Sequence, residues 1–214
     1  MKKILLLILT LFLFLSCYII YQMTENETLN YVLVGDDLVN NPYIIKNNNY
    51  KNSFVNNDYR IIDLLRIIKY NEELVINDKM VSIHQQLMEA DVLVMAIGMN
   101  EIYYKLDSST KNKYAYINKL IYNLKELFKL INKYDYKKIY FIGYYNNNWQ
   151  HKELFNYLNT SVKRIVKDYN ICFVDIEKIA NGQGQDNEKS DILELNDDGY
   201  KKIYNFIVEN LEKC

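Results

Sequence analysis

The fold is decided by the run Asp91-Val92-Leu93-Val94-Met95-Ala96-Ile97-Gly98-Met99-Asn100. Residues 92–97 are all apolar, and a glycine follows them directly. An apolar run of this length, without alternating polar residues, is typical of a strand covered on both faces of a parallel sheet. The run therefore predicts a central strand, with polar groups placed at its carboxyl end.

Similar apolar runs occur before and after this strand, and helical patterns separate them. Besides 91–97, they predict strands at 31–34, 53–55, 138–142 and 171–176. Apolar residues at three- and four-residue spacing predict helices at 61–68, 80–89, 111–134, 153–169 and 197–212. We expect the asparagine-rich segment 40–57 to be mostly loop, because asparagine favours turns. The alternation predicts an α/β three-layer sandwich, with a five-stranded parallel sheet between helices.

The N-terminal 21 residues predict a membrane segment. Two lysines precede an apolar stretch at 4–21, which as a helix would reach about 27 Å, close to the thickness of a bilayer core. Two interpretations remain open. Phe14-Leu15-Ser16-Cys17 resembles a lipobox, with Cys17 as the lipidated residue of a bacterial lipoprotein, whereas the apolar residues 18–21 favour an uncleaved single-pass anchor. Both place the following domain outside the membrane, since lysines favour a cytoplasmic start.

The rest of the chain has room for one domain. We divide the 214 residues into a signal or anchor segment at 1–21, a linker at 22–30 and a domain at 31–214.

Lysine and arginine number 26 against 27 aspartates and glutamates, so no basic surface for nucleic acid is expected. Three cysteines do not make a disulfide framework. Cys172 is interpreted as a small buried hydrophobic residue, with a bridge to Cys214 as the alternative.

Four short blocks lie at the ends of predicted strands or at the start of the last predicted helix. They are Gly35-Asp36-Asp37-Leu38, Gly98-Met99-Asn100-Glu101, Phe173-Val174-Asp175-Ile176 and, from Asp191, the block Asp-Ile-Leu-Glu-Leu-Asn-Asp-Asp-Gly-Tyr. In order and spacing the chain resembles the SGNH (GDSL) hydrolases, whose blocks read Gly-Asp-Ser-Leu, Gly-x-Asn-Asp and Asp-x-x-His-Leu-Asn-x-x-Gly-Tyr. The resemblance covers nearly all of 31–214 and implies that family's five-stranded parallel sheet, in a flavodoxin-like arrangement.

The resemblance also shows where this chain departs from the family. Asp37 stands where the family has its nucleophilic serine, and Glu194 stands where it has the histidine base. Asp58 is aligned with the glycine whose backbone N–H binds the oxyanion. Asn100, another oxyanion donor in the family, and Asp191, the partner of the family's histidine, are kept.

These departures are unfavourable for acyl transfer by a serine mechanism. A serine hydroxyl needs a base because it must lose a proton, and the Asp37 carboxylate has none to give. A charge on Asp58 about 4 Å from a developing oxyanion would cost about 4 kcal/mol at an effective dielectric of 20, roughly a thousandfold in rate. A serine esterase is therefore not expected.

Three functions stay in competition. The first is a catalytically inactive module that binds envelope glycan, lipid or protein at the cell surface. The second is a Ca²⁺ or Mg²⁺ site formed by Asp36, Asp37 and Glu194, with Asp58 and Asn100 as further oxygen ligands; no other cofactor is expected. The third is an altered ester hydrolase, in which Asp37 attacks acylated carbohydrate or lipid and Glu194 activates water.

Neither histidine supplies the missing base in this interpretation. His84 lies in a predicted helix before the central strand and is expected to be structural or exposed. His151 and Trp149 lie in a loop after the fourth strand, at the end of the sheet where ligands gather, but we expect packing roles for both.

Overall fold

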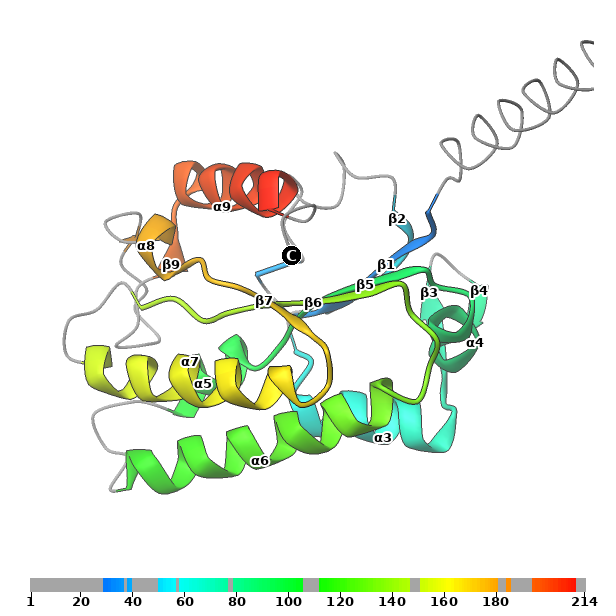
Figure 1. Ribbon diagram of the computed structural model, residues 1–214, viewed down its shortest axis with the longest axis horizontal. Helices are drawn as coiled ribbons and strands as arrows, with labels where there is room; N and C mark the ends of the chain where they lie inside the picture. Colours follow the sequence, from blue (N-terminus) through cyan, green and yellow to red (C-terminus); the bar gives the residue numbers. More distant parts are fainter. Residues whose placement is uncertain are drawn as a thin grey trace, which may run out of the picture.

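The computed structural model describes residues 29–36, 38–39, 50–56, 58–76, 79–105, 112–146, 151–180, 184–185 and 194–210. Its central sheet has the order β2-β1-β5-β6-β7, and every neighbouring pair is parallel (Figure 1). The strands are β1 (Tyr31–Gly35), β2 (Tyr50–Val55), β5 (Val92–Ala96), β6 (Lys138–Ile142) and β7 (Cys172–Val174). The predicted five-stranded parallel sheet in flavodoxin-like order is therefore confirmed.

Helices cover both faces of this sheet. On one face lie α3 (Ile61–Tyr70), α6 (Lys113–Ile131), α7 (Lys152–Lys167) and the short α5 (Met99–Lys105). On the other face lie α8 (Glu177–Ala180) and α9 (Asp197–Asn210), which contact each other (Figure 1). Helix α6 contacts both α3 and α7, so the three long helices of the first face pack as one row. The predicted three-layer arrangement is confirmed.

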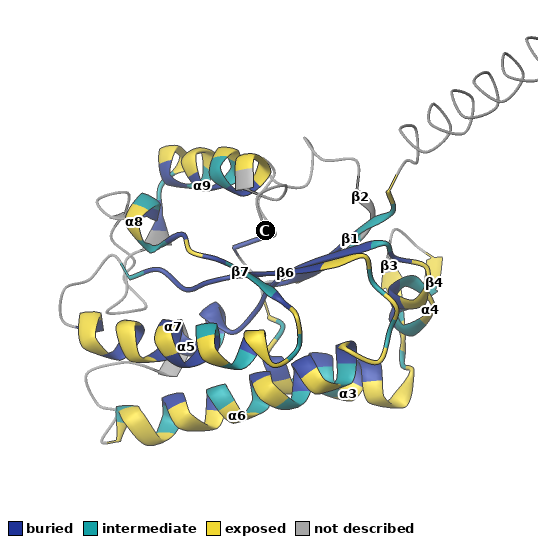
Figure 2. Ribbon diagram, in the orientation of Figure 1, coloured by how far each residue is buried: buried dark blue, intermediate teal, exposed yellow. Residues whose placement is uncertain are grey.

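The core extends from the sheet to the row of long helices on one face and to α8 and α9 on the other, where Ala180, Ile203 and Ile207 are buried. All five residues of β5 are buried, which agrees with its sequence as an uninterrupted apolar run. Figure 2 shows the buried residues concentrated in the sheet and on the inner sides of the helices. In α6 the buried side chains recur every three or four residues, as an amphipathic helix requires: Ile117, Leu120, Leu124, Leu127, Phe128 and Ile131.

One predicted helix is partly a hairpin. The segment 80–89 was expected to be helical throughout, but β4 (Lys79–Ser82) pairs antiparallel with β3 (Glu73–Ile76). Helix α4 (Ile83–Met88) begins only at Ile83, because the Ser82 Oγ accepts a hydrogen bond from the Gln85 N–H and caps the helix. The extended β2 likewise begins at Tyr50, inside the segment expected to be mostly loop.

Cys172 also differs from its sequence interpretation. It is half-buried and disulfide-bonded, rather than a free buried residue. Its partner lies outside the described residues, as do the predicted membrane segment at 1–21, including Cys17, and most of the linker. Within the part of the chain that the structure describes, no helix combines the length and apolar character needed to cross a membrane.

Candidate functional site

The carboxyl ends of three strands meet at one level of the sheet. Gly35, the last residue of β1, is the register partner of Ala96 in β5 and of Val55 in β2. The chain passes from β1 to β2 on one side and later to β5 on the other, so the strand order reverses beside β1. Ligands of open α/β sheets bind at such a reversal, outside the carboxyl ends of the strands. The candidate site therefore lies where β1 and β5 end.

Asp36 joins these two strand ends. Its side chain is fully buried, and its Oδ2 accepts hydrogen bonds from the backbone N–H groups of Gly98 at 2.8 Å and Asn100 at 3.2 Å. Its own N–H donates to the Ala96 carbonyl at 2.9 Å. The carboxylate thus holds the turn from β5 into α5 against the end of β1 and brings Asn100 beside Asp36, as the sequence blocks implied.

Gly98 occupies the tightest position of this turn. Its φ is +102°, in a region that residues with a Cβ rarely adopt. A Cβ there would also lie 2.9 Å from the hydroxyl oxygen of Tyr144. The backbone of the β5–α5 turn is therefore compatible only with glycine at this position.

Tyr144, which the sequence analysis did not single out, supports the turn from the β6 side. The side chain is buried, and its hydroxyl donates to the Ile97 carbonyl at 2.8 Å. Burial raises the pKa of Tyr144 well above its ordinary value, so the phenol stays protonated and keeps this donor role. Tyr144 connects the ends of β5 and β6 directly beside the candidate site.

The buried amide of Asn159 in α7 holds the backbone of Tyr144. Its Oδ1 accepts from the Tyr144 N–H at 3.0 Å, and its Nδ2 donates to the Tyr144 carbonyl at 2.8 Å. Both backbone groups of one loop residue are thereby satisfied by one side chain. The sequence signal for this role is a polar residue directly beside Leu158 on the apolar face of a predicted helix, where leucine or valine would otherwise be expected.

Replacing Asn159 by leucine is therefore expected to destabilise the fold. The variant leaves a backbone donor and a backbone acceptor of Tyr144 buried without these partners, and should lower the free energy of unfolding by about 2–4 kcal/mol. Chemical denaturation monitored by circular dichroism measures the loss. Asn156→Leu, on the exposed side of the same helix, is the matched control and should change stability by less than about 0.5 kcal/mol. Equal effects of the two variants would contradict the assigned role.

Glu101 connects α5 to two other helices. Its Oε2 accepts from the Ile61 N–H at 2.9 Å, at the N-terminus of α3, and its backbone carbonyl accepts from the Tyr116 hydroxyl at 2.8 Å in α6. Burial raises the pKa of Glu101 above its ordinary value of 4.5, and the Ile61 hydrogen bond opposes this only in part. Glu101, the last residue of the block Gly98-Met99-Asn100-Glu101, thus fixes α5 against α3 and α6.

This raised pKa predicts a pH-dependent stability. A carboxyl group with a folded pKa above its unfolded value binds more protons in the folded state, so its contribution falls as pH rises through that interval. Glu101→Gln keeps an acceptor for Ile61 without this titration. The variant should therefore gain stability relative to the parent as pH rises above 4.5, with the difference levelling once Glu101 is ionised in both states. Unfolding curves at several pH values measure it, with Glu153→Gln in the exposed first turn of α7 as control.

Asp58 lies in the turn after β2 and is exposed. Its backbone N–H donates to the Asn56 Oδ1 at 2.9 Å. Because this residue is exposed, water screens its repulsion of a charge at about 4 Å, which lowers the expected penalty toward the roughly 1 kcal/mol of bulk water.

Several predicted site residues cannot be placed. Asp37, Asp191 and Trp149 lie outside the described residues, and of Glu194 only the backbone in β9 (Glu194–Leu195) is described. Just after it, the Asn196 Oδ1 accepts from the Gly199 N–H at 2.8 Å and caps α9. The asparagine and glycine of the last block thus have a structural role in starting this helix.

The cation hypothesis stays a prediction. Asp36, one of its three carboxylates, directs Oδ2 to two backbone N–H groups, which is not how a metal-ligating oxygen is partnered. Among the residues described, no group of three or more His, Cys, Asp or Glu side chains is arranged to hold a metal ion, but Asp37 and the Glu194 side chain are not in that set.

Of the two histidines, His151 is nearer to this edge of the sheet. It is buried at the residue preceding α7, after the loop that follows β6. His84 instead belongs to α4, where its Nδ1 lies 2.6 Å from the Tyr134 hydroxyl in a hydrogen bond. That contact agrees with the structural role expected for His84.

Comparison with known proteins identifies the fold. No family model and no curated protein matches the sequence. Among solved structures, the acetylxylan esterase of Geobacillus stearothermophilus matches with a TM-score of 0.63 and 13% identity, over 86% of this chain and 94% of the esterase. A catalytic mutant of that enzyme gives 0.64 and 12%, over the same shares of the two chains. An α/β hydrolase from the metagenome of Lake Arreo, Spain, gives 0.61 and 13%, over 85% of this chain and 94% of the hydrolase. The chain therefore has the hydrolase-like α/β fold of these enzymes.

Proposed function

We propose that the domain is a membrane-anchored, extracytoplasmic binding module that keeps a hydrolase-like fold without serine-esterase chemistry. One sequence observation supports the proposal: in the blocks that resemble the family's, Asp37 stands where the nucleophile is expected and Glu194 where the base is expected. Losing one of the two would impair the mechanism, whereas carboxylates at both positions remove the transferable proton and the imidazole together.

The esterase of Geobacillus stearothermophilus supports this alignment. Its catalytic mutants replace a serine, an aspartate and a histidine, and the last two lie three residues apart in its chain. Asp191 and Glu194 have the same spacing in this chain. The aspartate is thus retained, while the position of the imidazole holds a carboxylate.

The described part of the site favours a rigid ligand platform. Asp36 joins β1 to the β5–α5 turn, and Tyr144 joins that turn to β6. These contacts fix the backbone around the candidate site, and they contribute neither a nucleophile nor a base. A preformed site loses little conformational entropy when a ligand binds. A rigid site of this kind can therefore still bind a ligand when catalysis is absent.

We further propose that the ligand is an acylated carbohydrate of the cell envelope. We choose an acylated carbohydrate because the esterase of similar fold is an acetylxylan esterase, an enzyme named for an acetylated sugar polymer. The location follows the predicted segment 1–21, which would hold the domain outside the membrane as a lipoprotein through Cys17 or as a single-pass anchor. The disulfide at Cys172 supports this location, because disulfides persist mainly outside the cytoplasm.

The test compares binding with turnover in the same preparations. The detergent-solubilised chain, Asp37→Asn and Glu194→Gln are titrated with acetylated and deacetylated xylo-oligosaccharides by calorimetry, and assayed on aryl acetates. We expect saturable binding that prefers the acetylated sugars, with no hydrolysis beyond that of both variants. Ester turnover that depends on Asp37 would contradict the proposal and favour the carboxylate hydrolase instead.

A further inference from the structure

The N-terminal segment leaves the domain at the end of the sheet opposite to the candidate site. Residue 30 precedes β1, and its N–H donates to the Asp91 Oδ2 at 2.9 Å, just before β5. The Asn30 Nδ2 donates to the Glu89 carbonyl at 3.5 Å, at the C-terminal end of α4. Figure 1 shows α4 and the β3–β4 hairpin at the end of the molecule where β1 begins. The segment therefore joins the domain beside α4.

Exposed apolar side chains gather in the elements at this end. Among the residues described, five large hydrophobic side chains are more than 60% exposed, and four of them lie within 70–88. We name these four the end patch: Tyr70, Val75, Met80 and Met88. Val75 and Met80 are direct cross-strand partners, at 69% and 64% exposure, so the hairpin presents them together on its outer side.

Along the hairpin, side chains alternate between a face packed on the core and an exposed face. Leu74 and Val81 form the neighbouring cross-strand pair and pack against the core. The opposite face of a hairpin that is packed on one side is ordinarily polar, because water solvates it. Two apolar residues at the centre of that face, in a hairpin outside the main sheet, therefore indicate a surface with a partner.

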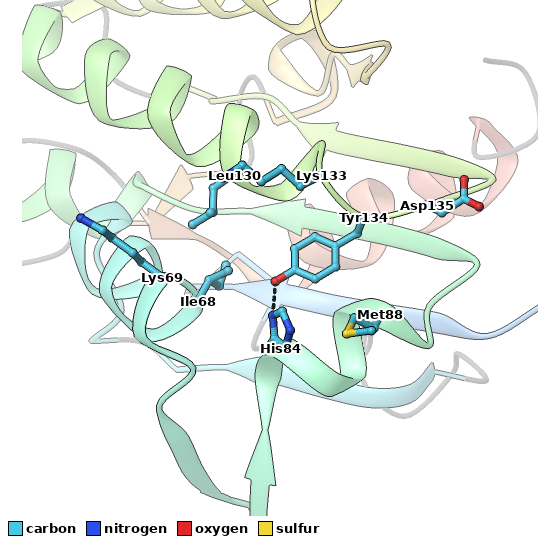
Figure 3. Close-up of a pocket in the computed structure, with 8 residues that line it drawn as sticks. All are labelled: Ile68, Lys69, His84, Met88, Leu130, Lys133, Tyr134 and Asp135. Atoms are coloured by element: carbon cyan, nitrogen blue, oxygen red, sulfur yellow. Dashed lines mark hydrogen bonds between the residues drawn. The ribbon is translucent and has the colours of Figure 1, made fainter.

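A pocket continues the end patch at Met88. A cavity of about 600 Å³ lies between α3, α4 and α6, with Ile68, Leu130 and Met88 as its apolar lining (Figure 3). The hydrogen bond between His84 and the Tyr134 hydroxyl joins α4 to the end of α6 inside it. Lys69 and Lys133 also line the pocket, and side chains of this kind reach from apolar surroundings to polar headgroups.

We propose that the end patch and its pocket rest on the bilayer that the N-terminal segment enters; this inference rests on the proposed membrane anchoring. Seven residues, 22–28, separate the apolar segment from the first described residue, and they span at most about 25 Å when fully extended. If Cys17 carries a lipid instead, the eleven residues 18–28 span at most about 40 Å. The end of the domain beside α4 is thereby confined to the vicinity of the bilayer. Exposed apolar side chains at this end are stabilised when they enter the interfacial region of the bilayer, because their apolar surface is then removed from water.

This orientation restricts the class of ligand that the proposed binding site can reach. The strands run from the patch end to the candidate site, and five residues of strand span about 17 Å. The candidate site at the carboxyl ends of β1 and β5 therefore faces away from the bilayer. It faces the carbohydrate layers outside the membrane, and the acyl chains of membrane lipids stay out of its reach.

Fluorescence quenching by lipids tests the contact on the full chain. The protein is reconstituted into phosphatidylcholine vesicles with brominated acyl chains, and tryptophan emission is compared with vesicles of unbrominated lipid. Met80→Trp and Val75→Trp each add a reporter to the patch, while Tyr122→Trp in α6, a site with similar exposure of 62%, is the control. The parent, with one tryptophan, gives the baseline. We expect the added emission of both patch variants to fall at least twofold and that of the control to stay unchanged.

Two outcomes would overturn the inference and are distinct from each other. Protein that floats with the vesicles but shows no quenching at either patch position is anchored, with another face toward the lipid. Protein that does not float with the vesicles lacks the anchoring itself, and the inference fails with it. The second outcome also removes the membrane anchoring from the proposed function. Neither outcome alters the oligosaccharide titration, so ligand binding is judged separately.

Discussion

Replacing Asp36 by alanine should lower the free energy of unfolding by about 3–5 kcal/mol, among the larger effects of a single substitution. The Oδ2 of this carboxylate is an acceptor for the N–H groups of Gly98 and Asn100, and the side chain is fully buried. Alanine leaves both donors without this partner in a place that water does not reach. Each loses a hydrogen bond to a charged group, worth about 1.5–3 kcal/mol in proteins.

The comparison with Asp36→Asn separates the hydrogen bonds from the charge. The asparagine Oδ1 can accept from the same two N–H groups, so this variant should retain about half of the stability that alanine loses. Asp58→Ala, at the exposed turn after β2, is the matched control and should change stability by less than about 0.5 kcal/mol. Urea denaturation followed by circular dichroism measures all three. Similar losses for Asp36→Ala and Asp58→Ala would show that Asp36 does not hold the turn.

The sheet was predictable because buried parallel strands leave a local signature. Residues 92–97 carry no polar interruption, and four further apolar runs recur between helical patterns. The order of the strands was predictable only through the family resemblance, since apolar runs do not specify their neighbours. Residues 80–82 were assigned to a helix because alternation over so few residues is too short to distinguish from a helical pattern. The Ser82 cap decides the boundary, and it depends on the side chain meeting the Gln85 N–H.

The position of the candidate site was predictable from the sequence, but the side-chain contacts that hold it in place were not. Asp36 and Asn100 follow strands whose ends coincide, so their proximity could be inferred from the topology. Tyr144 and Asn159 meet through a loop and a helix 15 residues apart, and no local pattern pairs them. Glu101 was quoted only as part of a motif, because its contact with the start of α3 joins residues 40 positions apart. Contacts of this kind depend on how helices pack onto the sheet.

Restoring serine and histidine tests how much of a hydrolase site remains. The double variant Asp37→Ser, Glu194→His is expected to hydrolyse aryl acetates at least about 100 times faster than the parent, since a positioned general base contributes about 10²–10⁴ in rate. Asp191 retains the spacing needed to orient the new imidazole, and Asn100 remains beside the turn held by Asp36. Initial rates at pH 8, where the imidazole is neutral, measure the gain.

Single substitutions should not produce this gain, because the groups of a triad act as a unit. Asp37→Ser lacks a base, and Glu194→His lacks a hydroxyl to activate, so each should remain within a few-fold of the parent. Adding Asp191→Asn to the double variant should remove most of the activity, which distinguishes a working triad from a contaminating esterase. Adding Asp58→Gly should raise the rate only about fivefold, as about 1 kcal/mol of screened repulsion predicts. A double variant as slow as the parent, yet folded and still able to bind acetylated sugars, would show that the candidate site lacks the oxyanion geometry that an esterase needs.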